Sequence, residues 1–349
     1  MSLQFIMGNS GSGKSYCLYD TVVREAIENP DKNYLVIVPE QFTMQTQKDL
    51  CLAHPKGGIM NIDVLSFGRL AYRVFEEVGQ DARVVLDDEG KNLVLRKIAG
   101  ECEKDLKVFK GNLKKQGYIS EVKSVLSEFA QYGVDFERLD DFMKEVPPES
   151  YLHYKLDDIR TIYEKFEEYL SEKYITKEEM LDVLSDAVPY SDILKGSVVA
   201  MDGFTGFTPV QNRLIGELFS VCEKVMITVT MDGRENPYVY EHPYQIFALG
   251  KQMVTSLMKI AGEKKTEIEE PICLFERPVY RFRDCSEMAF LETELFRYSG
   301  AKYNGSCESV SLHEVRSPGK EAKYVAESIR RLVRTKGYRY RDIAVIASD

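Results

Sequence analysis

The chain has 349 residues, 44% of them hydrophobic and 29% charged, and a formal net charge of −10 at pH 7. This length is enough for more than one folding unit with a buried core. The sequence contains no apolar run of about 18 residues, so no membrane span is expected. The negative charge excludes binding to nucleic acid through a broadly basic surface and leaves only a local basic groove open.

Strands and helices alternate over the first 86 residues. Short apolar runs that end at glycine or proline indicate strands buried on both faces, and apolar residues at helical spacing follow each run. We expect strands at 3–7, 34–38 and 61–65, and helices at 14–27, 43–53 and 67–78. This alternation predicts an α/β protein with a parallel sheet that helices cover on both faces.

The pattern changes to helical periodicity between residues 87 and 189, where β-branched runs are nearly absent. We predict an all-helical insertion there, divided by the pair Pro147-Pro148. The α/β pattern then returns with expected strands at 197–201 and 225–230, followed by a polar surface excursion at 260–275. A last strand–helix–strand unit is expected at 309–315, 320–335 and 342–347, and we expect it to be cut short after its final strand.

Residues 8–15 read GNSGSGKS and match the phosphate-binding pattern G-x4-G-K-[S/T] at every position. Glycines let backbone N–H groups curl around phosphates at a helix N-terminus, where the helix dipole favours an anion. Lysine in this pattern reaches the β- and γ-phosphates, and the last hydroxyl ligates Mg²⁺. We therefore predict ATP-Mg²⁺ or a similar nucleotide, bound by Gly8, Asn9, Ser10, Gly11, Ser12, Gly13, Lys14 and Ser15.

Asp202 is the candidate for a second Mg²⁺ ligand, through a water molecule, because it ends the apolar run 198–201. P-loop ATPases place a catalytic Glu directly after such an Asp, to position the attacking water. Gly203 stands there instead, so the sequence supports nucleotide binding and leaves hydrolysis open. The alternative is that Asp202 only opens a turn with Gly203.

Several segments resemble one bacterial family in order and spacing. They are the loop GNSGSGKS, VIVPEQFTMQTQKDL at 36–50, DVLSFGRLAYRVF at 63–75 and AMDGFTGFTPVQ at 200–211. Together they resemble AddB/RexB, one of the two subunits of the ATP-dependent helicase/deoxyribonuclease that processes DNA double-strand breaks for recombinational repair. The segment 320–349 is similar to the start of the second motor domain of UvrD-like superfamily 1 helicases.

The resemblance implies a division of the chain into three parts. Residues 1–86 and 190–300 would form a RecA-like P-loop domain, residues 87–189 its helical insertion, and residues 305–349 the beginning of a second RecA-like domain. Beyond the present sequence, it implies a nuclease domain with an iron–sulfur cluster. No nuclease activity is expected from these residues, because no acidic cluster among them suits a two-metal site.

The resemblance to UvrD-like motors is partial at the motor motifs. Three positions of the motor motif have the expected residue: Asp202, Phe204 and Gln211. The catalytic Glu is absent, and the segment 230–234 lacks the Gln of the next motif. Arg283 stands near where motors carry an arginine for the γ-phosphate. This pattern implies a helicase-shaped subunit with degenerate motor motifs, paired as a heterodimer with an AddA-like helicase–nuclease that supplies translocation.

The resemblance also implies contacts with DNA, both single strands and duplex ends. Segments after the second and third strands touch single-stranded DNA in UvrD-like motors, through aromatic stacking and polar contacts to phosphates. The corresponding residues are Phe42, Ser66, Phe67 and Arg69. Each also has a structural interpretation; Ser66 would cap the helix that follows, and Phe67 would pack against it.

Two other functions remain open at this point. One is an autonomous ATP-dependent helicase or ATPase that uses another base; the other is a small-molecule P-loop kinase, which would need neither the insertion nor the last unit. The seven cysteines lie singly, without zinc-ligand spacing, so a metal site within the chain is not expected. No signal peptide is recognisable, and we expect a cytoplasmic protein without a membrane partner.

Overall fold

The computed structural model describes residues 1–79, 84–112, 115–170 and 173–347. Two compact units divide the chain, residues 1–281 and residues 282–349. Among the described residues, no helix is both long enough and apolar enough to cross a membrane.

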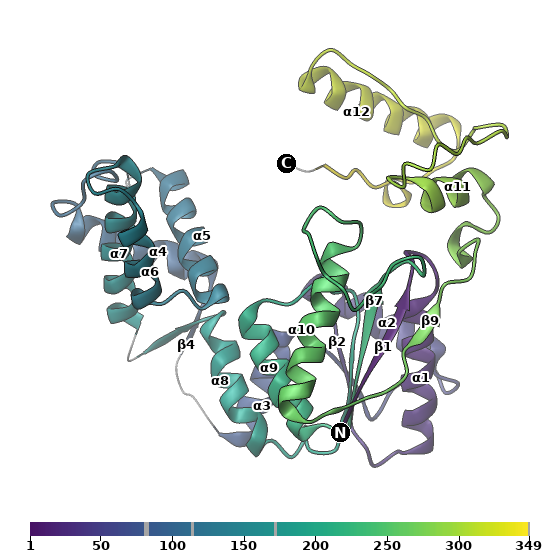
Figure 1. Ribbon diagram of the computed structural model, residues 1–349, viewed down its shortest axis with the longest axis horizontal. Helices are drawn as coiled ribbons and strands as arrows, with labels where there is room; N and C mark the ends of the chain where they lie inside the picture. The colour runs from purple at the N-terminus through teal and green to yellow at the C-terminus, as the bar shows by residue number, and fades with distance from the viewer. Residues whose placement is uncertain (80–83, 113–114, 171–172, 348–349) are drawn as a thin grey trace. The chain divides into compact units, whose positions relative to one another are not determined.

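A seven-stranded sheet forms the centre of the first unit (Figure 1). Its order is β3-β2-β6-β7-β1-β8, with β9 also pairing with β1, and every pairing is parallel. The strands are β1 (Ser2–Gly8), β2 (Tyr34–Ile37), β3 (Ile62–Leu65), β6 (Val198–Met201), β7 (Lys224–Thr230), β8 (Glu267–Ile268) and β9 (Ile272–Leu274). The predicted α/β class is confirmed, and each strand predicted between residues 3 and 230 forms.

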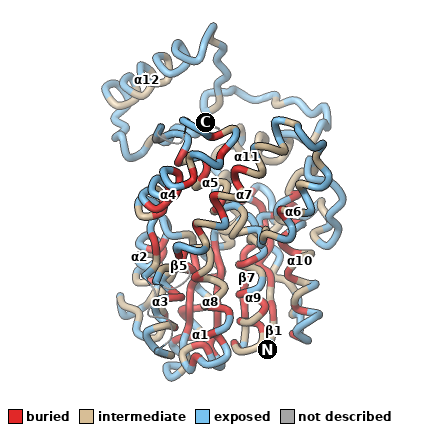
Figure 2. Tube along the Cα trace, turned by 90° about the vertical axis from the view of Figure 1, so that its left-hand side faces the viewer, coloured by how far each residue is buried: buried red, intermediate tan, exposed pale blue. Residues whose placement is uncertain are grey.

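Helices cover both faces of this sheet because its strands are apolar on both sides. In β1, Leu3, Phe5 and Met7 point into one core, whereas Ile6 points into the other, as the twofold repeat of a strand requires. Figure 2 shows the central strands, such as β1 and β7, as largely buried. The first core is completed by α3 (Phe67–Val78), α8 (Glu179–Ala187), α9 (Pro209–Val221) and α10 (Ala248–Lys264), the second by α1 (Lys14–Glu28) and α2 (Thr43–Ala53).

The polar surface excursion expected at 260–275 is wrong. Helix α10 continues to Lys264, and β8 and β9 then add to β1 at the edge of the sheet. Both strands are short; the two residues of β8 are exposed, Ile268 at 42%, whereas Ile272 and Leu274 of β9 are partly buried. Strand β8 carries no apolar run, and β9 has only three residues, too few for hydrophobic periodicity to identify.

A helical bundle with its own core lies in the chain between β4 (Val84–Leu86) and β5 (Tyr174–Thr176), which pair in parallel with each other. Its helices are α4 (Asp88–Cys102), α5 (Gln116–Tyr132), α6 (Phe136–Glu145) and α7 (Tyr151–Leu170). Their core includes Leu95, Ile98, Ile119, Leu126 and Phe166. Helix α8 follows β5 and packs in the core of the sheet, so the bundle core ends before residue 189.

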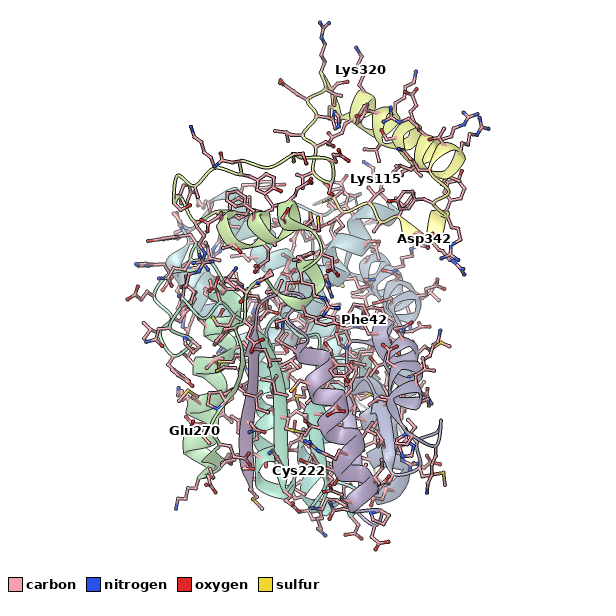
Figure 3. The ribbon with its side chains drawn as sticks, turned by 90° about the vertical axis from the view of Figure 1, so that its right-hand side faces the viewer. Phe42, Lys115, Cys222, Glu270, Lys320 and Asp342 are labelled. Atoms are coloured by element: carbon pink, nitrogen blue, oxygen red, sulfur yellow. The ribbon has the colours of Figure 1, made fainter. Side chains whose placement is uncertain are left out.

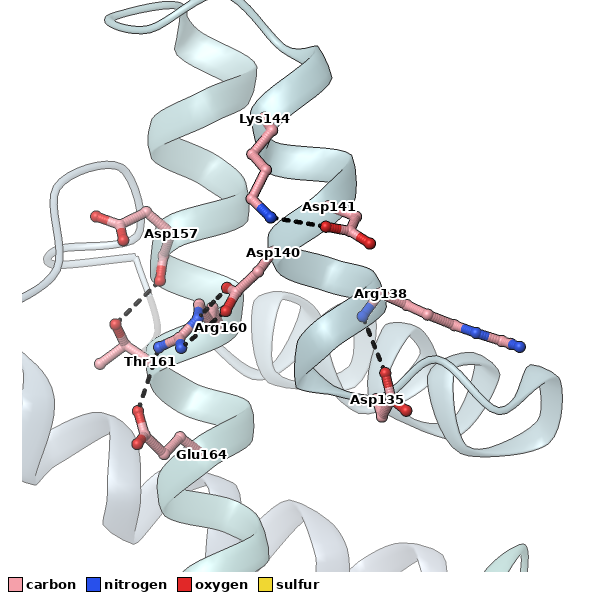
Figure 4. Close-up of polar contacts among 9 residues, drawn as sticks. All are labelled: Asp135, Arg138, Asp140, Asp141, Lys144, Asp157, Arg160, Thr161 and Glu164. Atoms are coloured by element: carbon pink, nitrogen blue, oxygen red, sulfur yellow. Dashed lines mark hydrogen bonds and ion pairs between the residues drawn. The ribbon is translucent and has the colours of Figure 1, made fainter.

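Charged side chains join helices α6 and α7 at the surface of the bundle (Figure 4). The guanidinium of Arg160 on α7 donates to both carboxylate oxygens of Asp140 on α6, at 2.5 and 3.3 Å. The same arginine lies 3.5 Å from Glu164, one turn along its own helix. Only the pair with Asp140 links the two helices, and because it is partly exposed, the apolar core supplies most of the packing energy.

The second unit contains helices α11 (Ser286–Glu294) and α12 (Pro318–Thr335), and neither helix has a buried residue. Helix α12 confirms the helix predicted at 320–335. The strands predicted at 309–315 and within 342–347 do not form in the part of the chain that the structure describes. A strand needs a hydrogen-bonded neighbour, and the described residues place none beside either segment.

Candidate nucleotide-binding site

The loop between β1 and α1 has the backbone shape that its sequence predicts. Strand β1 ends at Gly8, and α1 begins at Lys14. Gly11 and Gly13 have φ values of 86° and 96°, a left-handed conformation that other residues adopt only at a cost. The turn is closed by Asn9, whose carbonyl oxygen accepts from the Ser12 N–H at 3.1 Å and from Lys14 Nζ at 2.9 Å.

Lys14 holds its amine inside this turn. Burial lowers the pKa of Lys14 to about 8; the Asp202 carboxylate opposes that shift, and the Arg281 guanidinium adds to it. An ammonium ion in such a place is short of counter-charge, so a phosphate group would stabilise its protonated form. The Ser12 hydroxyl is also buried, without a hydrogen-bond partner among the described residues.

An open pocket of about 510 Å³ lies beside the loop. This volume is within the range of pockets that hold small ligands and cofactors. It lies at the carboxyl edge of the parallel sheet, where ligands of open α/β sheets bind. Its lining residues are Ser10, Gly11, Gly13, Lys14, Ser15, Tyr16, Asp202, Gly203, Phe204, Thr205, Thr228, Thr230, Tyr280 and Arg281.

The arginine at this pocket is Arg281, which the sequence did not single out. Its N–H donates to the Gly11 carbonyl at 3.0 Å, and a Cβ added to Gly11 would lie 2.7 Å from the Cβ of Arg281. Gly11 is thus required both by its φ and by this close approach. The predicted Arg283 belongs to the second unit, where its Nε lies 3.5 Å from Asp284 Oδ2. UvrD-like motors carry this arginine directly after a tyrosine, so the pair Tyr280-Arg281 was the signal in the sequence that could have identified it.

Asp202 follows β6 and is 7% exposed. Its Oδ1 accepts from the Thr228 hydroxyl at 2.6 Å, and its Oδ2 accepts from the Tyr19 hydroxyl at 2.8 Å. A carboxylate has about four acceptor positions, so these bonds satisfy part of its capacity. Ser15, the other expected Mg²⁺ ligand, is exposed in the first turn of α1.

Gly203 has a φ of 80° and lines the pocket directly after Asp202. A Cβ built there would lie 3.5 Å from Pro39 Cδ and 3.8 Å from Phe42 Cδ2, which are ordinary van der Waals contacts. The obstacle to a side chain is therefore the positive φ and not a lack of space. A side chain at this position would have to adopt the left-handed conformation. The position where P-loop ATPases carry the catalytic Glu therefore has, in this chain, a backbone conformation that favours glycine.

The residues predicted to contact DNA fall into two groups. Phe42 is 48% exposed, and Arg69 is exposed as well. Figure 3 shows Phe42 at the end of the sheet opposite Cys222, which precedes β7, and therefore at the same edge as the pocket.

Ser66 and Phe67 are only 4% and 8% exposed. The Ser66 hydroxyl caps α3 by accepting from the Arg69 N–H at 3.3 Å. The ring of Phe67 packs with those of Phe204 and Phe207, at centroid distances of 5.4 and 6.3 Å. The Ser66 contact matches the predicted helix cap, whereas Phe67 packs against two rings outside α3 and not against that helix. Contact of either residue with DNA stays a prediction.

Nucleotide affinity should fall as pH rises from about 7 to about 9. The pKa of Lys14 is about 8 in the free chain, and bound phosphates should raise it, so binding above neutral pH must take up a proton. The same lysine has a lower pKa folded than unfolded, so folding stability should rise with pH above about 8. Calorimetry of ATP binding, in two buffers with different ionisation enthalpies, measures the proton uptake.

Lys48, an exposed lysine on α2, provides the control for this measurement. Lys48→Ala should keep the uptake, and Lys14→Ala should remove whatever uptake accompanies residual binding. Proton uptake near zero at pH 8.5 in the unmodified chain would contradict the assignment of Lys14 to the phosphates.

Comparison with known proteins gives consistent matches along the chain. Residues 5–292 match the family described as "ADDB, N-terminal". A protein of Lachnoclostridium phytofermentans, named as the B subunit of an ATP-dependent helicase/deoxyribonuclease, is 42% identical over 351 residues, covering 99% of this chain. Proteins of the same name from Thermoanaerobacter sp. and Clostridium tetani are 36% and 34% identical, and each match covers 100% of this chain. The chain spans 30% of the length of each of these relatives.

Proposed function

The chain belongs to the AddB N-terminal family, as its motifs predicted, and from that premise we propose that it binds ATP-Mg²⁺ without turning it over. In this proposal it is the helicase-like part of an AddB polypeptide, within an ATP-dependent helicase/deoxyribonuclease that processes double-strand breaks. The proposal depends on two features seen together: a preorganised loop of the phosphate-binding type, and a glycine at position 203. The loop supports binding, whereas the glycine removes the residue that would activate water.

The loop residues fit a triphosphate. Gly11 and Gly13 have the conformations that turn backbone N–H groups inward, and a phosphate beside Lys14 would stabilise the charged form that burial disfavours. We propose that Arg281 adds a second positive charge for the phosphates, in the place first assigned to Arg283. Ser15 and Asp202 are oxygen donors, the ligand type that Mg²⁺ prefers, and bound Mg²⁺ would neutralise phosphate charge.

The finer fold assignment also belongs to this proposal. The parallel sheet of residues 1–281 would be a RecA-like domain, with the bundle as its insertion. Residues 282–349 would begin a second RecA-like domain, whose α12 already carries an amphipathic pattern. The strands expected at 309–315 and 342–347 would then form against neighbours that these residues do not supply.

Binding to DNA and to a partner protein completes the proposal. Exposed Phe42 offers a face for base stacking, and exposed Arg69 offers a phosphate contact. Ser66 and Phe67, which are buried, would support the exposed residues at the same edge of the sheet. The partner would be an AddA-like helicase–nuclease, and an iron–sulfur cluster is proposed only for the remaining part of the full-length AddB polypeptide.

Steady-state ATP hydrolysis tests the proposal directly. The chain should bind ATP yet hydrolyse it at the background rate, both with and without single-stranded DNA. Gly203→Glu should also remain at background, because the left-handed φ of 80° misplaces the new side chain. That conformation should cost about 1 to 3 kcal/mol of stability in the variant, measured by chemical denaturation.

Gly206→Glu is the matched control for Gly203→Glu. Gly206 has no atom within 4 Å of an added Cβ among the described residues and lacks a positive φ, so stability should hardly change. A DNA-stimulated ATPase rate that Lys14→Ala abolishes would favour the alternative, an autonomous ATPase. A Gly203→Glu variant as stable as the unmodified chain would contradict the claim that the backbone conformation at position 203 disfavours a side chain.

A further inference from the structure

A buried chain of hydroxyl groups runs beneath the nucleotide pocket. The Tyr19 hydroxyl on α1 donates to Asp202 Oδ2 at 2.8 Å and lies 3.2 Å from Thr46 Oγ1 on α2. A phenol has one hydrogen, and here the carboxylate receives it, so the Thr46 hydroxyl must be the donor in the second contact. The Thr228 hydroxyl on β7 reaches the other oxygen, Asp202 Oδ1, at 2.6 Å.

This network is well protected from solvent. Thr46 and Thr228 are each 4% exposed, and Asp202 is 7% exposed. Linked hydrogen bonds in a low-dielectric interior strengthen one another, so a change at one end is felt at the other.

The two ends of the network belong to different surfaces. Asp202 and Thr228 line the nucleotide pocket. Thr46 lies on the buried side of α2, whose N-terminal end carries Phe42, the residue before the helix, and Met44, which are 48% and 80% exposed. Phe42 also approaches Gly203 of the pocket, since a Cβ added there would lie 3.8 Å from its ring.

We propose that Tyr19 is a positioning residue that couples occupancy of the nucleotide pocket to the affinity of the start of α2 for single-stranded DNA. The proposal rests on the proposed function and adds its regulation. The Asp202 carboxylate accepts less strongly from Tyr19 when it shares its charge with a cation in the pocket. Tyr19 and Thr46 then readjust, and the start of α2 moves with them, together with Phe42, the residue before the helix.

The test measures coupling rather than either affinity alone. The Kd for a fluorescent oligothymidylate is determined for the 349-residue chain with and without a non-hydrolysable ATP analogue and Mg²⁺. The ratio of the two Kd values should be at least about fivefold in the unmodified chain, the lower end of common allosteric coupling. Tyr19→Phe, which removes only the hydroxyl, should bring the ratio close to one.

Two further variants separate coupling from general damage. Thr46→Val interrupts the same network from α2 and should also reduce the ratio, so the test survives if Tyr19→Phe fails to fold. Tyr190→Phe removes an exposed hydroxyl, 67% of that residue being accessible, and should leave the ratio unchanged. Circular dichroism checks the fold of each variant.

The possible outcomes test three claims separately: the role of Tyr19, the coupling itself and the proposed function. An unchanged ratio in folded Tyr19→Phe and Thr46→Val overturns the role of Tyr19. A ratio of one in the unmodified chain, with nucleotide binding measured by calorimetry, overturns the coupling and leaves the proposed function standing. No nucleotide binding at all in the unmodified chain overturns the proposed function and this inference together.

Discussion

Replacing Lys14 with alanine should weaken ATP binding by about 100-fold or more, equivalent to roughly 3 kcal/mol. The ammonium is held at the mouth of α1 by the Asn9 carbonyl, 2.9 Å from Nζ, inside the loop that would surround the phosphates. Calorimetry with ATP and Mg²⁺ measures the Kd directly. Lys48→Ala, which removes an exposed lysine on α2, should leave it within about twofold, as surface changes usually do.

The same substitution should not destabilise the fold. Burial lowers the pKa of Lys14 to about 8, which means that folding disfavours its charged form at neutral pH. Removing the amine relieves this penalty, so thermal unfolding should occur at the same temperature or higher. A Lys14→Ala chain that binds ATP as tightly as the unmodified chain would contradict the site, and an unfolded variant would contradict the electrostatic argument.

Replacing Asp158 with alanine should destabilise the helical bundle by about 3 to 4 kcal/mol. Asp158 lies on α7 and is 1% exposed. Its Oδ1 accepts from the Lys107 N–H at 2.8 Å, and its Oδ2 accepts from the N–H groups of Val108 and Phe109 at 2.7 and 2.8 Å. These bonds hold the segment that inserts Leu106 and Phe109 into the bundle core.

Hydrogen exchange followed by mass spectrometry is the suitable measurement, because the bundle has a core of its own. Peptides from α4 and α7 should lose protection in Asp158→Ala, whereas peptides from β1 and β7 should keep theirs. Asp157→Ala is the neighbouring control; Asp157 is 39% exposed in its ion pair with Lys107, and its removal should leave exchange nearly unchanged. Equal effects of the two substitutions would contradict the role of the buried carboxylate.

Hydrophobic pattern was enough to predict most elements of the sheet. The runs at β1, β2, β6 and β7 are apolar on both faces and end at loops, so their period and length identified them. Strand β8 has two exposed residues and no such run, and its formation depends on the neighbouring β1. The segment 309–315 shows the converse, since strand-like residues without a hydrogen-bonded neighbour do not form a strand.

The sequence by itself determined the backbone shape of the loop at residues 8–15 and the groups that it offers, because glycine, lysine and serine stand there at fixed spacing. It also determined the class of the fold, because local hydrophobic period decides helix or strand. Only the tertiary structure decided which distant groups meet there: Arg281 beside Gly11, and Tyr19, Thr46 and Thr228 around Asp202. Such meetings depend on strand order and helix packing, which bring together residues far apart in the chain, as with Tyr19 and Asp202 at a separation of 183.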